Sequence, residues 1–99
     1  MSAVPTPTVP TVSTIPRIGH GFRLQWEHAQ SCFVLLYPEG MVKLNQSAGE
    51  IMKRIDGQRD VAAIVADLET AFATSGLESD VLAFLELARR QRWLDWTQA

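Results

Sequence analysis

Residues 32–44 have the sequence CFVLLYPEGMVKL. The first part, from Cys32 to Tyr37, is apolar without alternation, which is typical of a strand that is central or covered on both faces. The Pro-Glu-Gly sequence at 38–40 predicts a turn, because proline presets one dihedral and glycine tolerates positive φ. Residues Met41–Leu44 then predict a short strand, so this stretch indicates a β-hairpin.

The segment before the hairpin alternates with period two. Phe22, Leu24 and Trp26 are separated by polar residues, which predicts a half-buried strand. Three strands with short connections favour an antiparallel meander. The short third strand is then expected at an edge of the sheet, where Lys43 can discourage unwanted pairing.

Beyond the hairpin the apolar period becomes helical. Ser47 and Glu50 form a capping-box pattern that starts a first helix, and Asp60 is a suitable N-cap for a second. The second helix has an apolar stripe of Val61, Ile64, Val65, Leu68 and Phe72. A third helix is predicted from about Glu78 to Arg90. Three strands followed by three helices indicate an α+β fold of winged-helix type.

The two ends of the chain differ from this pattern. Residues 1–15 alternate proline with threonine and serine, which predicts a disordered tail without enough apolar surface to order it. We therefore expect one folded domain over residues 16–96. The segment from Trp93 to Trp96 is short and is expected to pack back on the sheet.

Composition argues against several function classes. The 99-residue chain has a net charge of −2 and no basic run, so no nucleic-acid partner is expected. No apolar run reaches the roughly 18 residues of a membrane span, and no secretory signal is recognisable, so no membrane partner and a cytoplasmic location are expected. The single cysteine, Cys32, excludes an internal disulfide.

The sequence offers no set of residues for catalysis or for binding a metal or cofactor. His20 and His28 lack a ligand partner at helical or hairpin spacing. Cys32 lies in an apolar strand, where a buried and inert thiol is the usual state. Glu39 and Glu50 are explained more simply by a turn and a cap than by acid–base chemistry. The protein is therefore not expected to be an enzyme.

The third helix is more apolar than a surface helix requires. Leu77, Val81, Phe84, Leu85 and Ala88 form its core stripe, while Leu82 and Leu87 widen the apolar arc on either side. An edge strand beside such a helix would make a groove suited to an extended peptide. Two alternatives remain open, namely that Trp93 and Trp96 cover this surface or that a second copy of the chain does.

From Pro16 to about Leu87 the chain resembles the PqqD family of pyrroloquinoline quinone (PQQ) biosynthesis. The resemblance is sharpest at residues 35–39, Leu-Leu-Tyr-Pro-Glu, which match a Leu-Leu-x-Pro-Glu signature. It continues through Leu44–Asn45, Asp56–Gly57 and Asp80–Val81. Gln91–Arg92–Trp93 departs from the family, which usually has a glycine soon after the third helix.

The resemblance implies a recognition element for ribosomally made, post-translationally modified peptides. Such a protein would bind the precursor peptide PqqA and present it to PqqE, a radical S-adenosylmethionine enzyme. The peptide would add as a strand beside the third strand and lie against the third helix. The implied peptide-binding residues are Met41, Val42, Lys43, Leu44, Asp80, Val81, Phe84 and Leu87.

Two other functions are compatible with the sequence. A structural or oligomerisation subunit, including a homodimer with exchanged segments, would bury the third helix without a peptide. A winged-helix DNA-binding protein would use that helix for recognition, but Glu78 and Asp80 in its first turn would repel phosphate.

Overall fold

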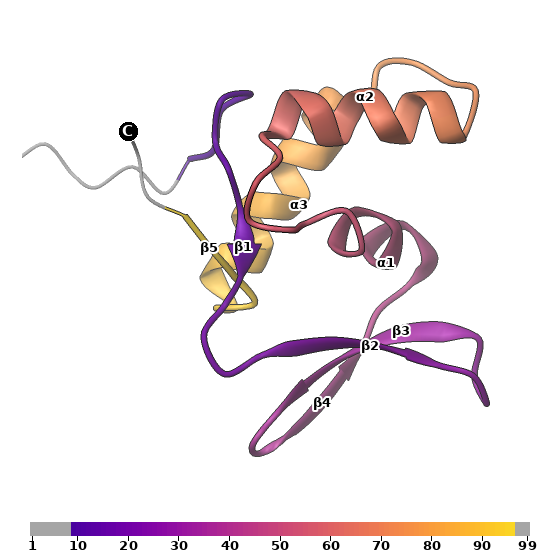
Figure 1. The fold of residues 1–99 in the computed structure, drawn as a ribbon, viewed down its shortest axis with the longest axis vertical. Coiled ribbons are helices and arrows are strands. Elements are labelled where there is room, and N and C mark those ends of the chain that lie inside the picture. Colours follow the sequence, from indigo (N-terminus) through magenta and orange to yellow (C-terminus); the bar gives the residue numbers. More distant parts are fainter. Residues whose placement is uncertain (1–8, 97–99) are drawn as a thin grey trace, which may run out of the picture.

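The computed structural model describes residues 9–96, and Figure 1 shows how their elements are arranged. The elements in chain order are β1 (Arg17–Ile18), β2 (Arg23–Glu27), β3 (Cys32–Tyr37), β4 (Gly40–Lys43), α1 (Gln46–Met52), α2 (Val61–Ala71), α3 (Glu78–Arg90) and β5 (Leu94–Asp95). The expected α+β fold, with a three-stranded antiparallel sheet and three helices, is confirmed.

The main sheet has the strand order β2-β3-β4, and both pairings are antiparallel. The apolar strand β3 is therefore central, and β4 is an edge strand as expected. Residue Tyr37 pairs with Gly40, so the turn consists of residues 38 and 39. Gly40 begins β4 and does not have a positive φ, so our reason for a glycine there was wrong.

The helices lie on one side of this sheet (Figure 1). Leu35 faces them and is fully buried, whereas Val34 points to the other face because side chains alternate along a strand. Val34 is nevertheless buried, and it lies between Gln25 of β2 and Lys43 of β4 in register. The central position of β3, one of our two expectations for this apolar strand, is confirmed, and the burial of Val34 shows that the face away from the helices is covered there as well.

Side-chain caps mark the start of α1 and α2, whereas the Leu77 side chain makes no capping hydrogen bond at the start of α3. Asp60 caps α2 as expected, since its side chain accepts a hydrogen bond from the Ala63 N–H at 2.9 Å. The cap of α1 is Asn45, which accepts from the Ala48 N–H at 2.8 Å, so the predicted capping box of Ser47 and Glu50 was wrong. Asn45 fills this role because its carboxamide oxygen reaches the third amide of the helix.

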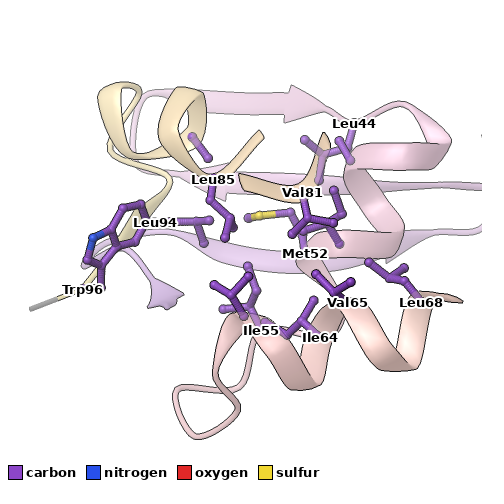
Figure 2. Close-up of a cluster of buried hydrophobic side chains, with 14 of the residues drawn as sticks. Leu44, Met52, Ile55, Ile64, Val65, Leu68, Val81, Leu85, Leu94 and Trp96 are labelled. Carbon is purple, nitrogen blue, oxygen red and sulfur yellow. The ribbon is translucent and has the colours of Figure 1, made fainter. Parts of the chain in front are cut away.

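The hydrophobic core lies between the three helices and the inner face of the sheet. Figure 2 shows Met52 of α1 between the apolar side chains of α2 and α3, with Leu44 at one end and Leu94 and Trp96 at the other. The predicted stripe of α2 is buried from Val61 to Leu68. Phe72 departs from it, because α2 ends at Ala71 and the Phe72 side chain is 47% exposed.

A second, two-stranded sheet was not predicted. β1 pairs with β5 in antiparallel register, and the Gly19 N–H donates to the Trp93 carbonyl at 2.7 Å. Trp96 is buried, with the Arg89 guanidinium 4.9 Å from its ring centroid. The C-terminal segment therefore packs on β1 and α3, and not on the main sheet as we expected.

Residues 9–15 belong to the stretch expected to be a disordered tail, and the structure instead places part of it against α2. The Val61 N–H donates to the Thr14 carbonyl at 2.9 Å, and the Ala62 N–H donates to the Val12 carbonyl at 3.0 Å. The first amides of a helix have no partner within it, so these carbonyls satisfy two of them. The rest of that stretch, residues 1–8, lies outside the described residues.

Candidate functional site

The outer edge of β4 carries backbone groups that the sheet does not use. Hydrogen-bonded and non-hydrogen-bonded pairs alternate along an antiparallel ladder. The Leu44 N–H donates to the Phe33 carbonyl at 3.0 Å, which fixes the phase of this alternation. Val42 therefore bonds to β3, and the N–H and C=O groups of Met41 and Lys43 point to the free edge.

The four predicted edge residues thus divide into two pairs. Met41 and Lys43 have exposed side chains on the outer face of the sheet, beside their outward backbone groups. Val42 is half-buried and Leu44 is buried in the core. The first pair is accessible to a partner, whereas the second pair anchors β4 to the body of the domain.

The predicted residues of α3 divide in a similar way. Asp80, Phe84 and Leu87 recur at intervals of four and three, so they share one face of the helix. Asp80 is exposed, Phe84 is half-buried against the core and Leu87 is 46% exposed. Val81 lies about 100° around the helix from Asp80 and is buried, so it supports this face from the core side.

A pocket of about 340 Å³ opens where the three helices meet. Its lining includes Ser47 and Glu50 of α1, Phe72 at the end of α2, and Leu77, Asp80 and Val81 at the start of α3. Two of the predicted site residues, Asp80 and Val81, are therefore brought together with α1. None of the predicted β4 residues lines this pocket.

The pocket nevertheless lies next to the end of β4. Gln46 and Ser47, which line it, begin α1 only a few residues after Lys43. The β4 edge and the Asp80 end of α3 are therefore joined through the first turn of α1. The sequence analysis did not predict the pocket. Its one signal was Phe72, an apolar residue at the end of the α2 stripe that stays exposed and lines the pocket.

Two carboxylates line the pocket, and they have different surroundings. The Glu50 carboxylate is 2.8 Å from the Arg54 guanidinium and 3.7 Å from the Lys53 ammonium. Burial alone would lower the pKa of Arg54, but hydrogen bonds to Glu50 and Asp67 outweigh it and raise that pKa. Asp80 forms no ion pair within residues 9–96, so its charge faces solvent at the pocket rim.

The residues discounted for catalysis lie apart from this pocket. His20 is exposed, and His28 is exposed with its ring 6.4 Å from that of Trp26. Cys32 begins β3 and is only partly buried, whereas we expected a buried thiol. Among the residues described, no three His, Cys, Asp or Glu side chains are grouped so as to hold a metal ion.

Across residues 9–96, every helix is too short or too polar to cross a bilayer.

The sequence matches one protein family and several known proteins. The family described as "Coenzyme PQQ synthesis protein D (PqqD)" matches residues 32–94. Two relatives named "PqqA binding protein" are those of Pseudomonas aeruginosa strain UCBPP-PA14, 56% identical over 89% of this chain and 97% of the relative, and Azotobacter vinelandii, 57% identical over 86% and 94%. A third, from Klebsiella pneumoniae, is 48% identical over 83% of this chain and 90% of the relative.

A solved structure shares the fold. It is the solution structure of the PqqD truncation of Methylobacterium extorquens PqqCD, described as a functional, stand-alone recognition element for ribosomally synthesised and post-translationally modified peptides. The TM-score is 0.75 at 29% sequence identity, and the alignment covers 89% of this chain and 96% of that one.

Proposed function

The chain belongs to the family of coenzyme PQQ synthesis protein D (PqqD), and from that membership we propose that it binds the precursor peptide PqqA and acts as a peptide chaperone in PQQ biosynthesis. The names of three relatives, each a PqqA binding protein, support this proposal. So does the structural likeness to a PqqD recognition element.

The observation that carries the mechanism is the free edge of β4. Met41 and Lys43 together offer two N–H and two C=O groups in the plane of the sheet. An extended peptide that pairs with them becomes a fourth strand, which is the mode of recognition called β-augmentation. The backbone supplies affinity in this mode, and neighbouring side chains supply specificity.

The side chains around this edge have distinct roles in the proposal. Met41 and Lys43 flank the added strand, while Val42 and Leu44 hold β4 in place. Asp80, Phe84 and Leu87 form the wall that the peptide lies against, and Val81 supports that wall. Burial of the Leu87 side chain, which is 46% exposed, would add apolar contact area on binding.

The bound peptide is then presented to PqqE, and this protein contributes no catalytic step of its own. Presentation requires that the bound peptide stay accessible on its outer side, which addition at a sheet edge allows. A cytoplasmic location and a homodimer of the free protein remain predictions. A purely oligomeric role would instead place a second copy on the β4 edge.

Amide hydrogen exchange resolved by residue tests the strand addition. The Met41 and Lys43 amides should exchange rapidly in the free protein and become protected when PqqA binds. The Val42 and Leu44 amides should be protected in both states, which makes them internal controls. Saturable binding without new protection at Met41 and Lys43 would refute strand addition.

Titration calorimetry with PqqA, combined with light scattering, separates the chaperone from the oligomeric role. We expect saturable binding of one peptide for each chain. A dimer that protects the β4 amides and ignores PqqA would overturn the proposal.

A further inference from the structure

We infer that the pocket between α1, α2 and α3 holds one bulky apolar side chain of the bound peptide, and that a lysine or arginine beside that side chain pairs with Asp80. This inference rests on the proposed function, since it names what the peptide must carry. It concerns a pocket that lies beyond the β4 edge and shares only Asp80 with the face of α3 formed by Asp80, Phe84 and Leu87.

The apolar part of the pocket is built for an anchor side chain. Buried Ile51, Leu68 and Val81 come from the three different helices, and half-exposed Phe72 and Leu77 complete the lining. Its volume of about 340 Å³ is at the small end of the range for ligand pockets, which suits one anchor and not an extended molecule. Phe72 is 47% exposed, so its ring gains apolar contact area when a side chain of the peptide fills the pocket.

The charge of the pocket selects the neighbour of that anchor. Within residues 9–96, Glu50 and Asp80 line it and no lysine, arginine or histidine does. Arg54 and Lys53 already pair with Glu50, so Asp80 is the carboxylate left for a cation from the peptide. An acidic rim around an apolar pocket is complementary to an apolar residue next to a basic one.

The topology also gives the direction of the peptide. Every strand pair among the described residues is antiparallel, and an added strand that continues this meander runs opposite to β4. Such a strand begins beside Lys43, where β4 leads into α1 and the pocket. The anchor and its basic neighbour therefore precede the strand-forming residues in the peptide sequence.

A thermodynamic double-mutant cycle tests the charge pairing. Calorimetry would measure PqqA binding by the wild-type protein and by Asp80→Asn. The peptides would be PqqA and variants in which each lysine is replaced by norleucine, or each arginine by citrulline, one at a time. One replacement should weaken binding to the wild type about two- to fivefold and have no effect on binding to Asp80→Asn.

Glu78→Gln is the matched control. Glu78 and Asp80 both lie in the first turn of α3, where a carboxylate favours the helix dipole, but Glu78 does not line the pocket. A cation of PqqA should therefore couple to Asp80 and not to Glu78. This comparison separates peptide contact from stabilisation of the helix.

The variant Phe72→Ala tests whether an apolar side chain of the peptide enters the pocket. Phe72→Ala should weaken PqqA binding about five- to tenfold, and the loss should couple to one apolar residue that lies within two positions of the Asp80-coupled cation. Binding of PqqA with no coupling to Asp80 or Phe72 would overturn the inference and leave the proposed function intact. No binding of PqqA by the wild-type protein would overturn both.

Discussion

Replacing Lys43 with proline removes one outward backbone N–H from the free edge of β4 while leaving the sheet intact. Lys43 pairs with Val34 at a non-hydrogen-bonded position, so its N–H is not used by β3. Proline is tolerated in an edge strand when its nitrogen faces away from the sheet. We therefore expect Lys43→Pro to fold and to bind PqqA more weakly.

The size of the effect follows from the one hydrogen bond that is lost. A net contribution of about 0.5–1.5 kcal/mol for such a bond corresponds to a roughly two- to twelvefold weaker Kd. The peptide carbonyl that loses its partner stays near the rim of the sheet, where water can reach it. The loss should therefore lie within this range, without the larger penalty of a buried unsatisfied group.

Two control variants make the result decisive. Lys43→Ala removes the side chain and keeps the N–H, so it should bind PqqA nearly as well as the wild type. Val42→Pro removes an N–H that β3 uses, so it should lower the free energy of unfolding measured in urea. Folded Lys43→Pro with unchanged affinity for PqqA would refute addition of a strand at β4.

Three further predictions concern the stability of the fold. The Arg59 and Gln58 backbone N–H groups donate to Asp56 and hold its pKa below the ordinary value of 3.8, so its carboxylate stabilises the fold above that pH and stops doing so as acid protonates the folded form. Urea midpoints measured from about pH 6 to about pH 2 should therefore fall less steeply for Asp56→Asn than for the wild type; equal slopes would contradict the shift. Arg54→Met should cost about 1–3 kcal/mol in urea unfolding, because it leaves Glu50 without its closest cation; an unchanged midpoint would show that this ion pair is not stabilising. Gly19→Ala should cost about 1–3 kcal/mol, because the added Cβ would collide with the Arg92 carbonyl oxygen; thermal unfolding that matches the wild type would contradict this contact.

The elements set by local signals could be predicted from the sequence. Asp60 caps α2 as expected, because a side chain next to the first turn determines where that helix begins. α3 runs from Glu78 to Arg90 as its apolar spacing predicted, although no side chain caps it. The order of the main sheet also followed from short connections that leave a strand few neighbours to pair with. The family resemblance named Asp80, Val81, Phe84 and Leu87, but the sequence did not decide which of them face outward.

The elements that depend on distant contacts could not be predicted. β1 and β5 have two residues each, which is too short for any periodicity, and they are 75 or more residues apart in sequence. Thr14 is buried because its carbonyl meets an unpaired amide of α2, which composition cannot reveal. The choice of Asn45 over Ser47 as a cap was ambiguous because both residue types favour that position.

The candidate site was only partly visible in the sequence for a related reason. Alternation along a strand places the side chains of Met41 and Lys43 on one face and those of Val42 and Leu44 on the other. It does not show which pair has its N–H groups at the free edge. That depends on the hydrogen-bond phase, which the two-residue turn after Tyr37 sets. Similarly, the pocket requires the end of α2 to approach the start of α3, which no local pattern encodes.

The pairing of β1 with β5 has a consequence for how the stability of the domain relates to the edge of β4. Arg17 lies opposite Asp95, so the chain enters and leaves this ribbon at the same end, and Figure 1 shows that end well away from β4. The ribbon of β1 and β5 therefore ties the first and last strands of the described fold together at a place apart from the edge of β4. A change confined to this ribbon should accordingly alter the stability of the domain and leave the outward backbone groups of β4 in place.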